Sequence, residues 1–297
     1  MVRKRARRRR RAGLYARLVA SYRYVVVDVF TDRPLTGNQL AVFTDASALP
    51  EELMQPLARE LNYSETVFVL PAAGSGHVHI RIFTPYAELP FAGHPILGTA
   101  FVLAAPLQLV EIALETRAGV VPVAIEREGS RVVFGRMSQP PFGWRDYERG
   151  DELLAALALE RSELPVEVYD LGPTHVFVAL ASEDAVAALE PDLNALAGHG
   201  VCVNCFAGRG ARWKLRMFAP AFGVAEDPAT GSAAGPLAVH LARHGWTAFG
   251  DEIEIRQGEE IGRPSRLYAR AEGSEDAVER VEVGGSAVIV ARGEFRL

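Results

Sequence analysis

Residues 94–106 read HPILGTAFVLAAP, a run that is apolar on every side and carries a proline near each end. Pro95 suits the first turn of a helix, and Pro106 is placed where it can end one. A helix without a polar face has to be enclosed by other structure. The stretch therefore predicts a central helix wrapped by strands.

A second buried helix is predicted at residues 228–244, PATGSAAGPLAVHLARH, whose small side chains would let strands approach closely. An amphipathic surface helix is predicted at residues 50–61. Segments rich in β-branched and aromatic residues predict strands at residues 24–30, 40–43, 66–70, 77–83, 121–126, 131–137, 166–169, 175–180, 214–219, 253–257, 266–271 and 281–292. The expected fold class is α+β, with two curled mixed or antiparallel sheets, each around one central buried helix.

The two helical regions belong to a longer internal similarity. Three pairs of segments match: TVFV (66–69) with HVFV (175–178), RIFTP (81–85) with RMFAP (216–220), and HPxxGTA (94–100) with DPxxGSA (227–233). An ordered series of this kind indicates duplication of one unit of strands and buried helix.

The duplication predicts the domain organisation. The first domain is expected at residues 24–137, joined by a returning C-terminal strand at about 286–297, and the second at residues 138–285. Residues 1–23 hold ten basic side chains and no acidic one, so they are expected to form a disordered basic extension. The rest of the chain is strongly acidic and should repel nucleic acid.

Composition excludes several other classes. Hydrophobic residues make up 49% of the 297 residues, yet no stretch approaches the roughly 18 uninterrupted apolar residues of a membrane span. The Arg-rich start is not followed by the apolar segment of a signal peptide, so we expect a cytoplasmic protein without a membrane partner.

The two cysteines stand close together as Cys202-Val-Asn-Cys205. The pair could be a redox site, half of a zinc site or two small buried residues, and we favour the last because no matching ligand cluster accompanies it. His77 and His79 have strand spacing but lack a third ligand, so we interpret them as surface residues and predict no metal site.

The helix starts are the candidate binding site. Unpaired N–H groups and the helix dipole make each start an anion site, and a pseudo-two-fold arrangement would bring His94–Gly98 and Asp227–Ser232 face to face across a cleft. Thr99, Thr230 and Ser232 could add hydroxyl donors. Asp227 has the alternative role of capping its helix.

Glu65 is the candidate acid/base residue. It lies in Tyr63-Ser-Glu-Thr66, at the entry of an otherwise apolar strand. Partial desolvation there would raise its pKa toward neutrality, which suits a group that alternates as base and acid. The alternative is an exposed Glu at the end of a strand.

Together these motifs resemble the PhzF-like family of phenazine biosynthesis, which belongs with the diaminopimelate epimerase fold. The resemblance runs from about Tyr24 to the C-terminus. It is carried by TGNQLAVF (36–43), SET (64–66), RIFTP (81–85) with ELPFAGHP (88–95), DPATGSA (227–233) and QGEEIGRPS (257–265).

The resemblance implies two similar domains with an active site between them, commonly a homodimer, and catalysis without metal, nucleotide or pyridoxal cofactor. It implies an isomerase that shifts a proton on a small carboxylic acid. Glu65 would be the general acid/base, while His94, Asp227 and Ser232 would complete the catalytic set. The matching motifs add as substrate-binding residues Asn38, Gly93, Pro95, Thr230, Gly231 and Ala233.

Other readings stay open at this point. The related amino-acid epimerases use two cysteines, one at each helix start, but here those places carry Gly93-His94 and Thr230-Gly231-Ser232, which argues against two-thiol chemistry. A non-catalytic module that binds small acids or proteins on the same fold is a second possibility. A thiol redox protein using Cys202 and Cys205 is a third.

Overall fold

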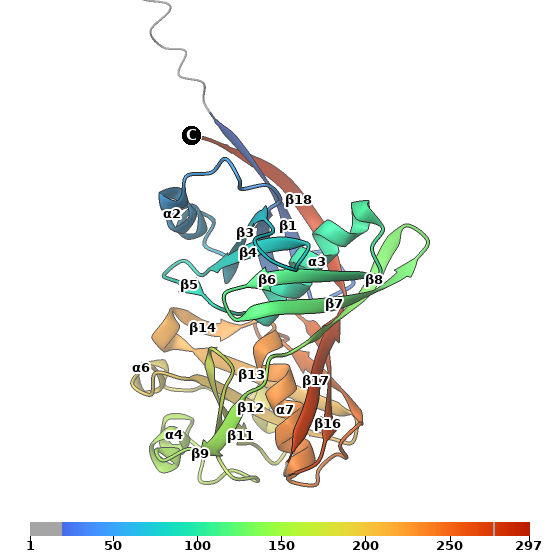
Figure 1. Ribbon diagram of the computed structural model, residues 1–297. Coiled ribbons are helices and arrows are strands. Elements are labelled where there is room, and N and C mark those ends of the chain that lie inside the picture. The colour runs from blue at the N-terminus through green and yellow to red at the C-terminus, as the bar shows by residue number, and fades with distance from the viewer. Residues whose placement is uncertain (1–19, 276) are drawn as a thin grey trace, which may run out of the picture.

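The computed structural model describes residues 20–275 and 277–297, so most of the predicted basic extension, residues 1–19, lies outside the described residues. Figure 1 shows two lobes, one above the other, in each of which strands curl around a helix; strand pairing joins the strands of both lobes into one 18-stranded sheet. Helix α3 (Gly93–Leu107) runs through the first lobe and α7 (Gly231–Arg243) through the second. This mixture of helices with parallel and antiparallel strand pairs confirms the predicted α+β class.

The strands fall into two sets. The first lobe contains β1 (Ser21–Val29), β2 (Asn38–Phe43), β3 (Glu65–Pro71), β4 (Val78–Phe83), β5 (Glu88–Leu89), β6 (Glu111–Thr116), β7 (Gly119–Glu128), β8 (Arg131–Ser138) and β18 (Ala287–Arg296). The second lobe contains β9 (Gly143–Asp146), β10 (Glu167–Asp170), β11 (Thr174–Ala179), β12 (Cys202–Arg209), β13 (Arg212–Ala219), β14 (Val224–Asp227), β15 (Glu252–Gln257), β16 (Ser265–Gly273) and β17 (Val278–Gly285). Smaller helices are α2 (Glu51–Leu61), α4 (Gly150–Ala156), α5 (Glu183–Ala187), α6 (Leu193–Ala197) and the 3-10 turn η1 (Pro220–Phe222).

The two lobes repeat one pairing scheme. In the first, β2 is parallel to β3, β3 antiparallel to β4, and β4 parallel to β6. In the second, β11, β12, β13 and β15 pair in the same senses. Thr66 faces Phe83 in the first lobe and Val203 faces Phe218 in the second, so β3 corresponds to β12.

This register corrects one part of the predicted repeat. Residues 66–69 lie in β3, whose counterpart is β12, whereas residues 175–178 lie in β11, the counterpart of β2. The predicted match of these two segments is wrong, because Val-Phe-Val is a sequence that many buried strands share. The matches of β4 with β13 and of α3 with α7 are confirmed.

Each lobe is completed by one additional strand. In the first lobe β18 pairs antiparallel with β1 along its whole length, from Ser21 opposite Arg296 to Val29 opposite Ala287. In the second lobe β9 pairs with β10 in the same sense. The predicted single strand at residues 281–292 is therefore two strands, because β17 pairs with β8 and β16 while β18 pairs with β1. The domain boundaries stay a prediction, although β1 begins at Ser21 rather than at Tyr24.

Helix α3 is enclosed as its sequence predicts, with Ile96, Leu97 and Ala100 fully buried. Helix α7 begins three residues later than predicted, because Asp227 still belongs to β14. Helix α2 packs Met54 and Leu57 against the outer side of the first sheet. None of the helices in the described ranges combines the length and apolar character needed to cross a membrane.

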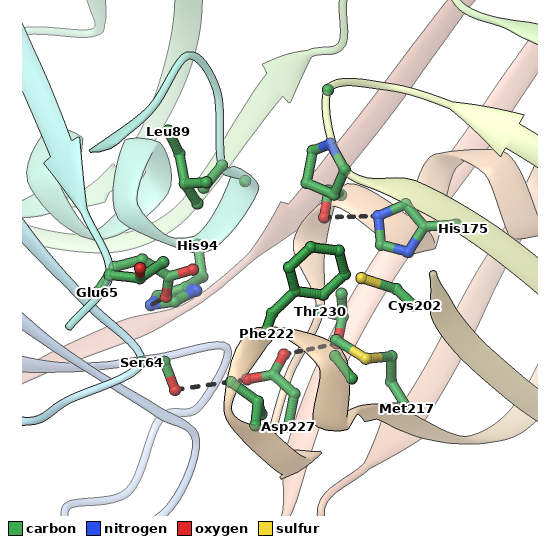
Figure 2. Close-up of a pocket in the computed structure, with 18 of the residues that line it drawn as sticks. Ser64, Glu65, Leu89, His94, His175, Cys202, Met217, Phe222, Asp227 and Thr230 are labelled. Carbon is green, nitrogen blue, oxygen red and sulfur yellow. Dashed lines mark hydrogen bonds and ion pairs between the residues drawn. The ribbon is translucent and has the colours of Figure 1, made fainter. Parts of the chain in front are cut away.

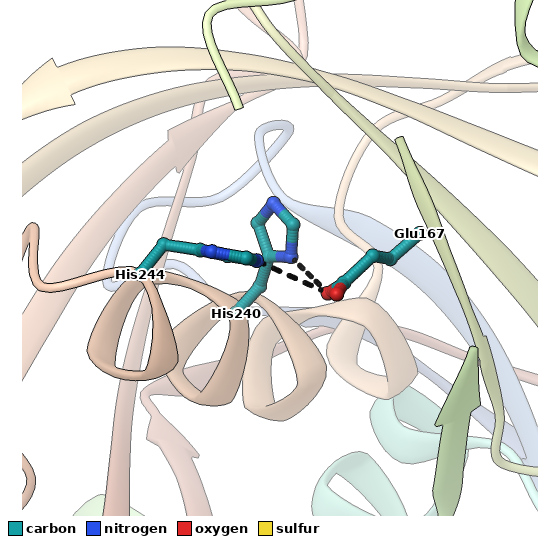
Figure 3. Close-up of side chains that lie close together, drawn as sticks. All are labelled: Glu167, His240 and His244. Atoms are coloured by element: carbon teal, nitrogen blue, oxygen red, sulfur yellow. Dashed lines mark hydrogen bonds and ion pairs between the residues drawn. The ribbon is translucent and has the colours of Figure 1, made fainter. Parts of the chain in front are cut away.

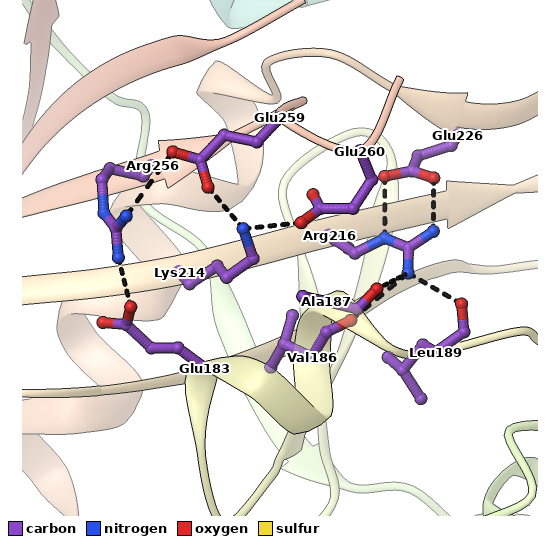
Figure 4. Close-up of polar contacts among 10 residues, drawn as sticks. All are labelled: Glu183, Val186, Ala187, Leu189, Lys214, Arg216, Glu226, Arg256, Glu259 and Glu260. Carbon is purple, nitrogen blue, oxygen red and sulfur yellow. Dashed lines mark hydrogen bonds and ion pairs between the residues drawn. The ribbon is translucent and has the colours of Figure 1, made fainter. Parts of the chain in front are cut away.

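Each lobe contains an equivalent arginine–glutamate ion pair on the strands that precede its buried helix. Arg81 forms a bidentate pair with Glu88, with both N–O distances 2.7 Å, and Arg216 forms one with Glu226, at 3.0 and 2.8 Å. Figure 4 shows that Arg216 also donates to main-chain carbonyls in the last turn of α5 and just beyond it, those of Val186, Ala187 and Leu189. Because Glu226 precedes Asp227 in β14, this network fixes the strand that ends at Asp227.

Candidate active site

A pocket of about 570 Å³ opens between the lobes where the starts of α3 and α7 meet. The two starts are in backbone contact, since a Cβ atom added to Gly93 would lie 2.7 Å from the carbonyl carbon of Gly231 and 2.9 Å from the nitrogen of Ser232. Glycine is thus required at residue 93 for the close approach. The predicted meeting of the two helix starts is present.

Most of the predicted site residues gather here. Those that line the pocket are Glu65, Gly93, His94, Asp227, Thr230, Gly231 and Ser232. Asn38, Pro95 and Ala233 are buried behind the pocket wall rather than on its surface. Figure 2 shows Glu65 and His94 on one side of the pocket, and His175 and Cys202 on the other.

Glu65 is enclosed beside His94. Its side chain is 15% exposed, and its Oε2 lies 3.2 Å from Nε2 of His94, although the pair lacks the alignment of a hydrogen bond. Burial, and then the charge of Asp227, raise the pKa of Glu65 well above its usual value. Burial lowers the pKa of His94 to about 3. The contact therefore joins a carboxyl group whose protonated form is favoured by burial to an imidazole that is uncharged near neutral pH.

Asp227 is the second carboxyl group of the pocket. Its Oδ1 accepts hydrogen bonds from Nδ2 of Asn38 at 3.0 Å and from Oγ of Ser64 at 3.5 Å, while its Oδ2 accepts from Oγ1 of Thr230 at 2.6 Å. It makes no bond to the N–H groups of α7, so it does not act as the helix cap. Burial raises its pKa to about 6, so Asp227 is ionised near neutral pH, and its charge favours the protonated form of Glu65.

The second-lobe wall contains side chains that the sequence did not assign to the site. His175 is fully buried, with its Nε2 3.0 Å from Oγ of Ser232. Cys202 is 5% exposed, as expected for a buried thiol, but it also lines the pocket together with Met217. Burial raises the pKa of Cys202 to about 12, so its thiol stays protonated at neutral pH.

Two exposed aromatic residues line the pocket beside these buried groups. Tyr86 of the first lobe is 66% exposed and Phe222 of the second is 47% exposed. The Tyr86 ring lies over Gly223, where an added Cβ atom would come within 2.3 Å of it. A ligand would pass from these apolar rings to the polar groups at the helix starts.

A possible metal-binding cluster lies elsewhere. Within residues 20–275 and 277–297, the only set of three side chains close enough to share a metal is Glu167, His240 and His244, none of which lines the pocket (Figure 3). The Arg243 guanidinium lies 2.7 Å from the same Glu167 oxygen that both imidazoles face. Because the guanidinium of Arg243 already supplies the positive charge beside Glu167, we interpret these residues as an internal ion-pair cluster that links α7 to β10.

Comparison with known proteins gives the family of the chain. Residues 27–293 match the model of the phenazine biosynthesis-like protein family, PhzC-PhzF. The chain is 55% identical to the trans-2,3-dihydro-3-hydroxyanthranilate isomerase of Pseudomonas aeruginosa over 93% of this chain and 100% of that protein.

Solved structures show the same architecture. A PhzF-family phenazine biosynthesis protein from Bacillus anthracis superposes with a TM-score of 0.82 at 25% identity, covering 94% of this chain and 100% of that one. A hydroxyproline epimerase from Agrobacterium vitis shares the fold alone, with a TM-score of 0.66 at 13% identity over 93% of each chain. The chain is therefore an isomerase with an epimerase-like fold, and it belongs to the phenazine biosynthesis-like protein family.

Proposed function

We propose that the protein is a cofactor-independent isomerase that moves a proton on a small carboxylate-bearing substrate, with Glu65 as the general acid/base. The observation that carries this proposal is the pairing of two carboxyl groups in one pocket. Burial and the charge of Asp227 raise the pKa of Glu65 well above its usual value, which suits this group to alternate as proton donor and acceptor.

The reaction needs only one such group. Protonated Glu65 would give its proton to one carbon of a conjugated ring, and the resulting carboxylate would take a proton from another carbon. One C–H bond forms, one breaks, and Glu65 returns to its starting state. The facing wall offers a protonated thiol in Cys202 and a thioether in Met217, neither of which is a base. Proton transfer is therefore expected on the face that Glu65 contacts.

The helix starts supply the binding site for the substrate's negative group. The backbone N–H groups at Gly93 and Gly231, with the hydroxyl of Ser232, would hold a carboxylate without an arginine or a metal. We propose trans-2,3-dihydro-3-hydroxyanthranilate as the substrate, because that name describes the activity of a relative sharing 55% of the sequence.

The test is turnover of this compound in heavy water. Wild-type protein should place solvent deuterium on the product ring, followed by NMR. Glu65→Gln, which keeps the shape of the side chain, should lose turnover by about 10²- to 10⁴-fold while retaining the fold. Glu60→Gln is the matched control, because Glu60 is an exposed glutamate in α2.

Full activity in Glu65→Gln would overturn the proposed role of this residue. Binding without any exchange in the wild-type protein would support the non-catalytic module instead. From the family resemblance we also propose a homodimer that acts in the cytoplasm. Sedimentation velocity tests the dimer, and fractionation of the source cells tests the location.

A further inference from the structure

A buried chain of three side chains, Asn204, His175 and Ser232, runs from β12 through β11 to the start of α7. Asn204 and His175 are fully buried, and Ser232 is 7% exposed. In the parallel pairing of the two strands, Cys202 faces His175. Asn204 lies two residues further along β12 and therefore points to the same side as Cys202. The strand register thus brings the amide beneath the imidazole.

The orientation of the Asn204 amide is set by two main-chain carbonyls. Its Nδ2 lies 3.2 Å from the oxygen of Val176 and 3.1 Å from the oxygen of Cys202. Only the NH₂ group can donate to these two acceptors, so the amide cannot be turned around without losing both bonds.

This orientation determines the tautomer of His175. Nδ2 of Asn204 also lies 3.3 Å from Nδ1 of His175, so its two hydrogens are shared among three acceptors. Because an amide nitrogen does not accept a hydrogen bond, a proton on Nδ1 would have no acceptor there, and Nδ1 is therefore unprotonated. Burial lowers the pKa of His175 to about 3, so the ring is neutral and carries its one proton on Nε2. Nε2 lies 3.0 Å from Oγ of Ser232 and donates to it.

Because the Ser232 hydroxyl accepts this hydrogen bond, its own hydrogen is free to be donated to another group. His175 is the only hydrogen-bond partner of this hydroxyl within residues 20–275 and 277–297, and Ser232 lines the pocket. We propose that His175 is a positioning residue, which fixes the Ser232 hydroxyl as a hydrogen-bond donor aimed at the carboxylate of the substrate. The proposal rests on the proposed function, because it names what Ser232 recognises in that same pocket.

The expected effect is on binding and not on the proton transfer itself. A hydrogen bond to a charged group is worth about 10- to 100-fold in affinity, and an oriented donor does not have to be reordered when the ligand arrives. Without Nε2–H the hydroxyl would turn to other acceptors or rotate freely. Loss of His175 should therefore raise KM and leave kcat nearly unchanged, whereas loss of Glu65 should lower kcat.

The test uses anthranilate, the stable aromatic relative of the proposed substrate, and 2-aminobenzamide, which has the same ring and a neutral amide in place of the carboxylate. Titration calorimetry on the full chain gives the ratio of their affinities. We expect His175→Phe and Ser232→Ala each to reduce the preference for anthranilate by about tenfold or more. The double variant should lose no more than either single variant, because both changes remove one donor. His79→Phe, a histidine variant away from the pocket, should leave the preference intact.

Additive losses in the double variant, or an unchanged preference in folded His175→Phe, would overturn the proposal. Nitrogen-15 NMR of the wild-type protein provides a test that does not depend on any variant folding. It should find His175 protonated on Nε2 alone near neutral pH, and an Nδ1–H tautomer would overturn the proposal. Both measurements are independent of turnover. A failure of the proposed role of Glu65 would appear in the turnover assay alone and can be distinguished from a failure of this proposal.

Discussion

Glu65 and Cys202 occupy equivalent positions in the two lobes. Each is the first residue of a strand that pairs in parallel with the strand before it, Glu65 facing Leu40 and Cys202 facing His175. Both side chains line the pocket. A duplicated architecture therefore carries different chemistry on its two walls, with an acid on one and a protonated thiol on the other.

The cysteines should be dispensable for turnover. In the double variant Cys202→Ala, Cys205→Ala we expect kcat to stay within about tenfold of wild type, because the raised pKa of each thiol leaves no thiolate at neutral pH. Steady-state kinetics and the deuterium assay measure this. Cys205 is fully buried, so a loss of about 1 kcal/mol in the free energy of unfolding is expected alongside. Abolished turnover in the folded double variant would revive the thiol redox reading.

The dependence of kcat/KM on pH should be bell-shaped. Activity should rise as Asp227 ionises near pH 6 and fall at higher pH as Glu65 loses its proton. In Asp227→Asn the rising limb should disappear. The falling limb should move to lower pH, because the charge that helps raise the pKa of Glu65 is gone. A rising limb that survives in this variant would assign it to another group.

Stability should decrease as pH rises through the range where Asp227 titrates. The unfolded carboxyl loses its proton near pH 3.8, whereas the folded one keeps it to about pH 6, so the native state binds more protons between these values. Stabilisation by the bound proton is then complete below pH 3.8 and lost as pH passes 6. Urea unfolding at several pH values should show this slope in the wild-type protein and a flatter one in Asp227→Asn. Equal slopes would contradict the burial-driven shift.

Gly93→Ala should separate the two helix starts. The new methyl group would meet the backbone of Gly231 at 2.7 Å, which main-chain atoms cannot relieve without moving. We expect a loss of about 1–3 kcal/mol in the free energy of unfolding and weaker binding of anthranilate. Gly143→Ala is the matched control, because an added Cβ there meets nothing within 4 Å. If both variants behaved alike, backbone contact at the helix starts would not be important for the site.

The sequence predicted the parts of the site that depend on local patterns. His94, Asp227 and Ser232 could be placed because each stands at or just before a helix whose apolar composition is visible in the sequence. For Glu65 the pattern of an acidic residue at the entry of an apolar strand left an exposed position as the alternative, and the family resemblance favoured the site. These patterns are local: an apolar helix has to be enclosed by other structure, and the residues at its start can be read directly from the sequence.

Contacts between distant strands could not be predicted in this way. His175 is the second residue of a strand like many others, and only the pairing of β11 with β12 and the approach of α7 bring it to Asn204 and Ser232. The position of Cys202 opposite Glu65 depends on the same long-range register. The break between β17 and β18 at Ser286 was missed although Gly284-Gly285-Ser286 is a turn signal in the sequence, because the apolar residues on both sides fit one continuous strand.

The pairing of β18 with β1 joins segments that lie more than 250 positions apart, from Ser21 with Arg296 to Val29 with Ala287. In the second lobe the corresponding pair, β9 with β10, is close in the chain, and the last strand of that lobe, β17, ends at Gly285, before β18 begins. During synthesis on a ribosome, we therefore expect the second half to mature first. The first lobe would keep an unpaired sheet edge on β1 until β18 has left the exit tunnel. A nascent chain stalled before β18 is made should accordingly be a favoured client of chaperones.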